Sequence, residues 1–284
     1  MSTVYEKDYD YPVESNRYRL IYANNCPFAH RVTIARELLG LDEVISQGAT
    51  SPVKTDKVWD FTNQKGGVDP VLGVKYVQNL YHTTNPNYNG PYSVPILVDV
   101  KTNQVVNQES LDLVYDFATR FKSYHKKDAP VLYPEGKDDE ISDWIKFITE
   151  DVLFAANRAG FAKDQEKYDE NVDIFFKALD KIDQQLEKNT FLLGNQLTVA
   201  DIILYTPLIR LEVVYYSAFG VNKRHIYDYK NLWPYMKKLY QIPAFKKTTN
   251  FEEIKKGFYL GKTGQSLFTR EVVPVGPDLS YWNE

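Results

Sequence analysis

Hydrophobic and polar positions in the first part of the chain predict an α/β unit. Arg17 to Ala23 alternates and is rich in β-forming residues, which predicts a strand. Pro27 to Leu39 has apolar residues at helical spacing, and Gly40 follows it as a C-terminal stop, so we expect a helix. Asp42 to Ser46 is expected to add a second, short strand. The order strand, turn, helix, strand is that of a βαβ unit.

The next part of the chain, from about residue 50 to 92, lacks a clear period. It is rich in Asn, Gly, Pro, Thr and Tyr, which predicts a long insertion with little regular structure apart from a short helix near Gly73 to Leu80. Ile96 to Val100 and Gln104 to Val106 are then expected to form a hairpin, and Glu109 to Thr119 a helix. Two strands and a helix after a βαβ unit indicate a thioredoxin-like domain.

From about residue 130 onward the pattern becomes helical almost throughout. We expect helices at Lys137 to Ala159, Gln165 to Lys188, Thr198 to Ser217 and Leu232 to Gln241. Thr198 caps the third of these and Asp201 has the spacing of its capping-box partner, which assigns this pair a structural role.

The predicted fold class is therefore an α/β thioredoxin-like N-terminal domain followed by an all-α helical C-terminal domain. We expect an N-terminal arm over residues 1–16, the thioredoxin-like domain over 17–122, the helical domain over 130–260 and a tail over 261–284.

Composition and charge narrow the classes of function. A net charge of -4 without a basic block argues against a nucleic-acid or anionic-membrane partner. No stretch approaches the ~18 apolar residues of a membrane span, and the first residues lack the apolar segment of a signal peptide. The single cysteine excludes an internal disulfide, which favours the cytoplasm. The four histidines have no metal-ligand spacing, so we expect no metal.

Cys26 is the candidate nucleophile. A lone cysteine is more often a small buried core residue, but this one follows a predicted strand and precedes Pro27 at the first helical position. Free N–H groups and the positive end of the helix favour the thiolate, so we expect a lowered pKa. His30 and Arg31 either add positive charge or face solvent. Without a second cysteine the resolving thiol must come from outside, and glutathione is the obvious supplier in a cytosol.

Two further pairs of residues fit the same domain. Val94-Pro95 begins a predicted strand, and we expect a cis peptide bond there that leaves the Val94 backbone free to bind an extended peptide. Glu109-Ser110 lies at a predicted helix start, where N–H groups and a hydroxyl can hold a carboxylate and Glu109 can hold an ammonium. The γ-glutamyl end of glutathione presents these two groups.

These motifs together resemble the glutathione transferase superfamily, and within it the xi-class glutathionyl-hydroquinone reductases. The resemblance covers nearly the whole chain and includes the segments CPFAHR, VPILVD, NQES and, in the helical half, GNQLTVADIILYTPLIRLEVVYYSAFG and NFEEIKKGFY. It implies that Cys26 is the nucleophile. The implied glutathione-binding positions are Phe28, Trp59, Val94, Pro95, Glu109 and Ser110. The implied positions for a second, small aromatic or disulfide substrate are Tyr215, Tyr259 and Asn157.

The resemblance also implies a reaction and an assembly. The thiolate attacks the sulfur of a glutathionyl-hydroquinone, and a second glutathione then releases glutathione disulfide. Family members also dimerise through the helical half. Two alternatives stay open, namely an omega-like enzyme for dehydroascorbate or mixed disulfides, and a non-catalytic binding protein.

This chain departs from the family pattern at four places. The family usually has Trp where Phe28 stands, a tyrosine at Asn157 and Ser-His at Gly261-Lys262, and it has a basic residue near Pro91.

Overall fold

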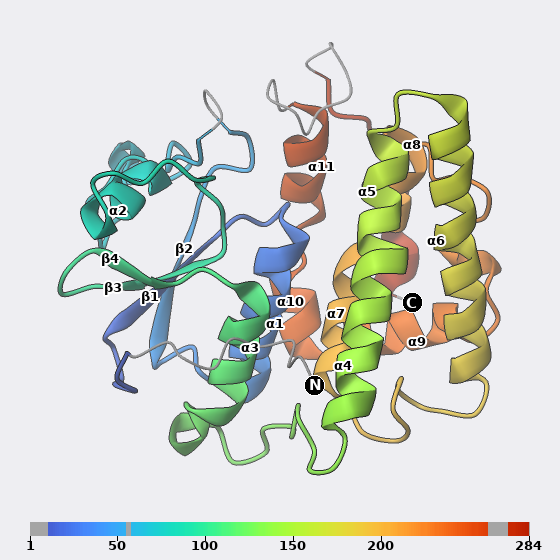
Figure 1. Cartoon of the computed structure of the whole chain (residues 1–284), viewed down its shortest axis with the longest axis horizontal. Helices are drawn as coiled ribbons and strands as arrows, with labels where there is room; N and C mark the ends of the chain where they lie inside the picture. The colour runs from blue at the N-terminus through green and yellow to red at the C-terminus, as the bar shows by residue number, and fades with distance from the viewer. Residues whose placement is uncertain (1–10, 55–57, 261–271, 284) are drawn as a thin grey trace.

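The computed structural model describes residues 11–54, 58–260 and 272–283. Most of the expected N-terminal arm and much of the expected tail, including Gly261 and Lys262, lie outside these ranges. The described chain has a part built around a β-sheet and a part built from helices, which lie side by side (Figure 1).

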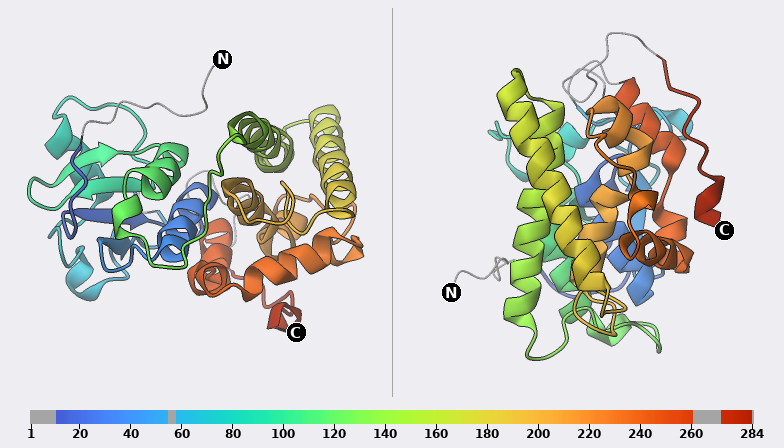
Figure 2. Two further views of the ribbon diagram at one scale, coloured as in Figure 1. Left: turned by 90° about the horizontal axis from the view of Figure 1, so that it is seen from below. Right: turned by 90° about the vertical axis from the view of Figure 1, so that its right-hand side faces the viewer.

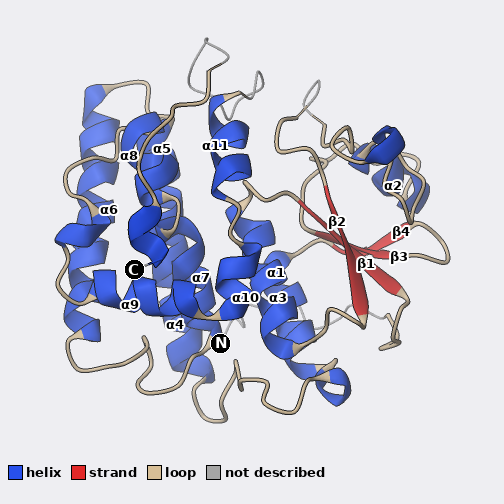
Figure 3. Ribbon diagram, turned by 180° about the vertical axis from the view of Figure 1, so that it is seen from behind, coloured by secondary structure: helices blue, strands red, loops and turns tan. Residues whose placement is uncertain are grey.

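The sheet has four strands in the order β2-β1-β3-β4 (Figure 3). Its strands are β1 (Tyr18–Tyr22), β2 (Ile45–Ala49), β3 (Ile96–Asp99) and β4 (Gln104–Asn107). β1 runs parallel to β2 and antiparallel to β3, and β3 runs antiparallel to β4. This mixed sheet confirms the thioredoxin-like domain that the sequence predicts.

Helices cover both faces of the sheet. Successive strand residues point to opposite faces, and apolar side chains on both faces are buried by helices. In β1, Leu20 belongs to the hydrophobic cluster shared with α1 (Pro27–Leu39) and α3 (Ser110–Thr119). The adjacent Ile21 belongs to a second cluster, shared with α2 (Val77–Thr84). α1 and α3 therefore lie between the sheet and the helical part, whereas α2 covers the outer face (Figure 1).

The helical part forms a bundle after residue 137, seen from two further sides in Figure 2. Its elements are α4 (Asp138–Phe147), a π-helical segment η3 (Ile148–Phe154), α5 (Ala155–Gly160), α6 (Gln165–Leu186), α7 (Val199–Leu208), a second π-helical segment η4 (Leu211–Tyr215), α8 (Tyr216–Ala218), α9 (Leu232–Gln241), α10 (Pro243–Thr248) and α11 (Phe251–Tyr259). In the described part of the chain no helix is both long enough and apolar enough to cross a membrane.

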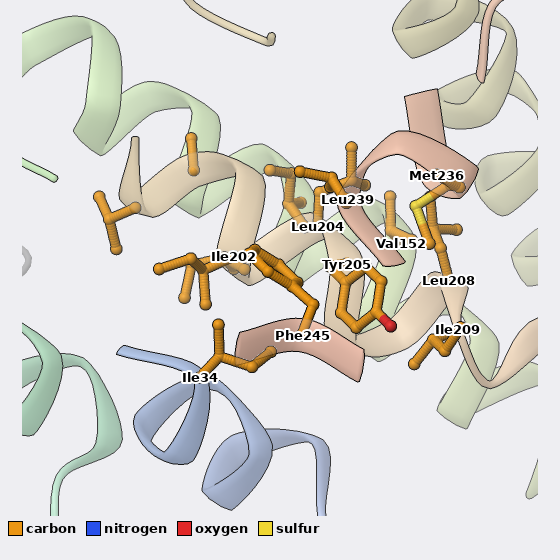
Figure 4. Packing of buried hydrophobic residues seen from close by; sticks show 14 of the residues in the cluster. Ile34, Val152, Ile202, Leu204, Tyr205, Leu208, Ile209, Met236, Leu239 and Phe245 are labelled. Atoms are coloured by element: carbon orange, nitrogen blue, oxygen red, sulfur yellow. The ribbon is translucent and has the colours of Figure 1, made fainter. Parts of the chain in front are cut away.

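Helix α1 joins the two parts through a common core. Ile34 of α1 lies in one packed cluster with Tyr205 of α7 and Phe245 of α10 (Figure 4). The rings of Tyr205 and Phe245 meet edge to face, with their centroids 4.8 Å apart. Full burial of one such side chain contributes about 1.5–3 kcal/mol to the free energy of folding. The helix that begins at Cys26 is therefore fixed against both the sheet and the bundle.

The expected boundaries are wrong at two elements of the first part. β2 begins at Ile45 and not at Asp42, because the preceding residues form a turn in which the N–H of Val44 donates to the carbonyl of Leu41 (3.1 Å). α2 begins at Val77 and not near Gly73, because Gly73 has a φ of 66° in a tight turn.

The expected helix over 198–217 is interrupted after Leu208. Pro207 has no N–H to donate to the carbonyl of Ile203, and the hydroxyl of Thr206 bonds that carbonyl at 3.2 Å. The chain resumes as η4, which carries Tyr215.

The capping box at the start of α7 is confirmed, and Asp201 does more than cap. Its buried carboxylate accepts hydrogen bonds from the N–H groups of Thr198 (2.8 Å) and Leu192 (2.9 Å) and from the hydroxyl of Tyr235 (2.8 Å). One side chain thus fixes the preceding loop and α9 to the start of α7.

We therefore expect Asp201→Ala to lower the free energy of unfolding by about 3 kcal/mol, because it leaves several buried donors without a partner. Asp164→Ala is the matched control: Asp164 caps α6 through a single exposed bond to the N–H of Lys167, worth about 1 kcal/mol. Urea denaturation of both variants measures the difference, and equal losses would contradict this role of Asp201.

Candidate active site

Cys26 lies at the N-cap of α1, as the sequence predicts. Its Sγ accepts a hydrogen bond from the N–H of Ala29 at 3.4 Å, in the way that a capping hydroxyl would. Pro27 occupies the first helical position, and the Cys26 carbonyl accepts from the N–H of His30 (3.0 Å). Cys26 as a whole residue is partly exposed, whereas its sulfur is surrounded by protein.

The Val94-Pro95 segment lies directly beside this thiol. The Val94-Pro95 peptide bond is cis, which confirms the expectation. The thiol of Cys26 donates to the carbonyl of Val94 at 3.4 Å, so this carbonyl is paired and not free as expected. The carbonyl would have to exchange this partner when the sulfur loses its proton.

The pKa of Cys26 differs from the expectation. Desolvation of the sulfur raises the pKa of the Cys26 thiol above its ordinary value, and this effect exceeds the opposing ones. The opposing effects are the N–H groups of Ala29 and Phe28 and the positive charges of Arg210 and Arg31, which favour the thiolate. The sequence shows the helix end that stabilises the anion, but it does not show how much water the surrounding protein removes from the sulfur.

His30 and Arg31 are both buried, which excludes the solvent-facing alternative. His30 does not add charge either, since burial and the nearby Arg210 hold the pKa of His30 well below its usual value. Its Nδ1 accepts from the Nη1 of Arg210 (3.1 Å), so the proton is on Nε2, which lies 3.3 Å from the hydroxyl of Thr248. His30 is therefore a neutral link between α1 and the helical part.

Arg210 is a site residue that the sequence analysis did not identify. It lies in the turn before η4 and donates from Nη2 to the carbonyl of Asn24 (2.9 Å) and from Nε to the carbonyl of Asn25 (3.2 Å). These are the two residues that precede Cys26. The one available signal was a single arginine inside the apolar run IILYTPLIRLEVVYY, where a buried charge needs a specific reason.

Two predicted glutathione-binding aromatic residues, Trp59 and Phe28, lie in the surroundings of Cys26. Trp59 is buried in the hydrophobic cluster against which Cys26 packs, and the Nζ of Lys54 lies 4.7 Å from the centre of its ring. Phe28 is partly exposed on α1, and its ring centroid lies 6.2 Å from that of Phe154 in η3. Phe28 therefore lies where the two parts of the molecule meet.

Glu109 and Ser110 stand at the start of α3, as expected, with Glu109 at the N-cap. The Glu109 side chain is exposed, while Ser110 is buried. The hydroxyl of Tyr81 donates to the carbonyl of Ser93, next to Val94 (3.1 Å). Burial raises the pKa of Tyr81 to about 12, and the negative charge of Glu109 contributes to this rise. Tyr81 thus fixes the segment beside the thiol and lies in the field of Glu109.

Tyr215 is fully buried, and its ring stacks on Phe219 with centroids 5.1 Å apart. Its hydroxyl has no hydrogen-bond partner among the described residues. Burial raises the pKa of Tyr215 to about 12, while the field of Arg210 lowers it and that of Cys26 raises it. Tyr215 thus lies within electrostatic range of the thiol, with an unused hydroxyl.

The two other predicted pocket residues have partners of their own. The hydroxyl of Tyr259 lies 2.5 Å from that of Ser217, close to the end of η4. The amide of Asn157 donates to the carbonyl of Leu153 in the preceding turn (2.7 Å). Tyr259 and Tyr215 are therefore brought close together by η4, whereas no described contact joins Asn157 to them.

The fold and the site define a class: a thioredoxin-like sheet with a thiol at the N-cap of its first helix, a cis-proline beside it and a helical part completing the surroundings. The comparisons with known proteins agree with this class. Residues 25–120 match the family model for the glutathione S-transferase N-terminal domain, and residues 165–238 match that for the C-terminal domain. The chain belongs to the glutathione S-transferase family.

Several relatives refine this placement. Glutathionyl-hydroquinone reductase YqjG from Escherichia coli (strain K12) is 34% identical over 93% of this chain and 80% of that protein. Its glutathione-bound structure matches with a TM-score of 0.86 over 93% of this chain and 86% of that chain. The glutathione-S-transferase Xi from Phanerochaete chrysosporium matches with a TM-score of 0.89 and 35% identity over 95% and 93% of the two chains.

Glutathione S-transferase omega-like 2 from Schizosaccharomyces pombe (strain 972 / ATCC 24843) is 34% identical over 93% of this chain and 86% of that protein. The resemblance that the sequence indicates, to the glutathione transferase superfamily and its xi class, is confirmed.

The raised pKa gives a direct prediction for the ligand-free protein. Iodoacetamide reacts with the thiolate, so the alkylation rate should rise with pH through a midpoint above the ~8.5 of an ordinary cysteine. Mass spectrometry of the alkylated chain at a series of pH values measures this midpoint. A midpoint below that of free cysteine would show that the helix end and the two arginines outweigh desolvation.

Proposed function

We propose that this protein is a glutathione-dependent thiol transferase that reduces glutathionyl-hydroquinones through a mixed disulfide between Cys26 and glutathione. The observation that carries the proposal is the position of the thiol at the N-cap of α1, hydrogen-bonded to the carbonyl of Val94. The reductase YqjG and its glutathione-bound structure support the choice of ligand and substrate.

In the proposed complex, glutathione runs from Cys26 past Val94-Pro95 to the start of α3. The backbone of Val94 would bind the peptide part as a neighbouring strand does, once its carbonyl no longer accepts from the thiol. Glu109 and the N–H groups and hydroxyl at Ser110 would hold the γ-glutamyl ammonium and carboxylate. Phe28 and Trp59 would flank the sulfur and exclude water from it.

The proposed reaction has two displacements at sulfur. The thiolate of Cys26 attacks the sulfur of the glutathionyl-hydroquinone, so that an S–S bond forms and the bond between sulfur and the ring carbon breaks. The electron pair of the broken bond goes to the ring carbon, which takes up a proton to give the hydroquinone. A second glutathione thiolate then attacks the glutathione sulfur of the mixed disulfide, which releases glutathione disulfide and restores the Cys26 thiolate.

The proposed site for the ring is the region of Tyr215, Tyr259 and Asn157. The hydroxyl of Tyr215 supports this assignment, because a buried donor without a partner costs stability unless a ligand uses it. In the complex it would donate to the ring and act as the acid from which the ring carbon takes up its proton. Asn157 stands where the xi class has a tyrosine and would leave more room beside the ring.

One relative favours a second candidate, an omega-like enzyme of the same thiol chemistry that reduces dehydroascorbate or mixed disulfides. The omega-like protein from Schizosaccharomyces pombe covers as much of this chain as the reductase does. The substitution at Asn157 concerns the proposed pocket for the second substrate, so it bears on this choice.

We also propose that the protein is cytoplasmic and forms a homodimer through its helical part, as xi-class members do. In this proposal residues 17–122 bind glutathione and residues 130–260 bind the second substrate.

The test uses a glutathionyl-hydroquinone together with glutathione. We expect release of free hydroquinone and glutathione disulfide, and a loss of at least about 1,000-fold in Cys26→Ser, because a hydroxyl cannot form the mixed disulfide. Turnover of dehydroascorbate or a hydroxyethyl disulfide alone would favour the omega-like candidate. Absence of turnover on all three substrates would contradict an enzymatic function.

Tyr215→Phe separates the role of this residue in catalysis from a role in folding. Turnover of the glutathionyl-hydroquinone should fall on the order of 100-fold, since a general acid or polarising hydroxyl is worth that much. The melting temperature should not fall, because the lost hydroxyl has no partner in the fold.

Tyr229→Phe is the matched control, since its buried hydroxyl is also unpartnered among the described residues but lies in the field of Arg224, not of Cys26. Equal activity in Tyr215→Phe and the natural protein would contradict the assignment.

A further inference from the structure

Arg31 has an unusual environment for a charged side chain. Only 1% of its surface is exposed, and its Nε and Nη2 have no hydrogen-bond partner among the described residues. No carboxylate pairs with it in the described part of the chain, and its guanidinium lies over the ring of Phe28 at 4.9 Å. A fold that buries a charge and leaves its donors unused pays several kcal/mol in stability.

The position of Arg31 indicates which anion its guanidinium can stabilise. It lies on α1 between the sheet and the helical part, just over one turn after Cys26, and its contact with Phe28 holds it beside the first turn of that helix. Two groups that can become negative feel its charge: the thiol of Cys26 and the hydroxyl of Tyr133. Of these, a cysteine thiol ionises closer to neutral pH.

Three other groups also influence the ionisation of the Cys26 thiol, and their effects have to be distinguished from that of Arg31. They are Arg210 in the turn before η4, Lys54 in the loop after β2, and the hydroxyl of Tyr215 in η4. Arg210 differs from Arg31 because its donors are used: they bind the carbonyls of Asn24, Asn25 and Thr206 and the ring of His30. Arg31 therefore differs from Arg210 in having N–H donors without a partner among the described residues.

We propose that Arg31 is the counter-ion of the Cys26 thiolate, a positioning residue whose unpaired guanidinium holds the anion that desolvation disfavours. This inference rests on the proposed role of Cys26 as nucleophile. It assigns to Arg31 a part of the positive charge that opposes desolvation, beside the larger contribution of Arg210. The cost of burying Arg31 without a partner is then recovered in the ionised enzyme, when the thiolate supplies the missing negative charge.

The test is the pH dependence of Cys26 alkylation in Arg31→Gln and Arg31→Lys. In Arg31→Gln the midpoint should move to higher pH, and alkylation at pH 7.5 should slow by on the order of tenfold, because one charge facing a poorly solvated sulfur is worth about one pKa unit. Arg31→Lys keeps the charge and should restore most of the rate. Arg224→Gln removes a partly exposed arginine of the helical part and is the control without effect.

A profile of Arg31→Gln that coincides with that of the natural protein would overturn the proposal. The same holds for Arg31→Lys behaving like Arg31→Gln. Alkylation requires neither glutathione nor turnover, so its outcome is independent of the assay that tests the proposed function. Failure of that assay with a shifted profile would refute the function and leave the role of Arg31 standing.

A second measurement covers the case in which the Arg31 variants do not fold. Cys26→Asp places a carboxyl group near Arg31, and Cys26→Asn is its neutral equivalent of the same shape. We expect the melting temperature of Cys26→Asp to be higher than that of Cys26→Asn. Asp164→Asn at the N-cap of α6 measures how much of such a difference comes from a helix end alone. The difference at Cys26 should exceed the loss of melting temperature in Asp164→Asn. A difference no larger than this reference would overturn the proposal.

Discussion

The constraint on which the site depends is the cost of placing a negative charge on a poorly hydrated sulfur. Protein surrounds the Sγ of Cys26, and the loss of water favours the neutral thiol. The end of α1 opposes this with N–H groups, and Arg210 and Arg31 oppose it with charge. A reactive cysteine in this fold is therefore not simply a thiol at a helix end. It is a balance between desolvation, which shields the sulfur, and a few donors and cations that hold its anion.

This balance requires both parts of the molecule. The residues before Cys26 are bound by the helical part: Arg210 binds the carbonyls of Asn24 and Asn25, and the amide of Asn24 donates to the carboxylate of Glu253 in α11 at 2.7 Å. Asn25 packs so closely against Gly257 that a side chain there would collide with it. The turn before η4 and α11 thus fix the thiol, and η4 and α11 also carry Tyr215 and Tyr259. The proposed nucleophile and the proposed pocket for the second substrate are positioned by the same elements.

Local signals in the sequence were sufficient to predict the fold and the position of the Cys26 thiol. The N-cap at Cys26, the cis bond at Val94-Pro95 and the capping box at Asp201 each depend on residues close together in the chain. Helix α11 also had such a signal, since Asn250 caps it and acidic residues follow in its first turn, although it was not among the expected helices.

What the sequence could not predict depends on contacts between distant segments. The hydrogen bond from Arg210 to the carbonyl of Asn25 joins residues more than 180 positions apart. The burial of His30 and Arg31 follows from the packing of α1 against the helical part. The raised pKa of Cys26 has the same origin, because desolvation is a property of the assembled surroundings and not of the motif.

In the proposed mechanism Cys26 carries glutathione as a covalent intermediate, and the most direct test is the intact mass of the protein after one turnover without a resolving thiol. The protein is mixed with a glutathionyl-hydroquinone in the absence of free glutathione, quenched with acid and analysed by mass spectrometry. We expect the mass gain of one glutathionyl group, located on the peptide that contains Cys26 and lost when glutathione is added. Release of hydroquinone from a chain that stays unmodified would contradict it.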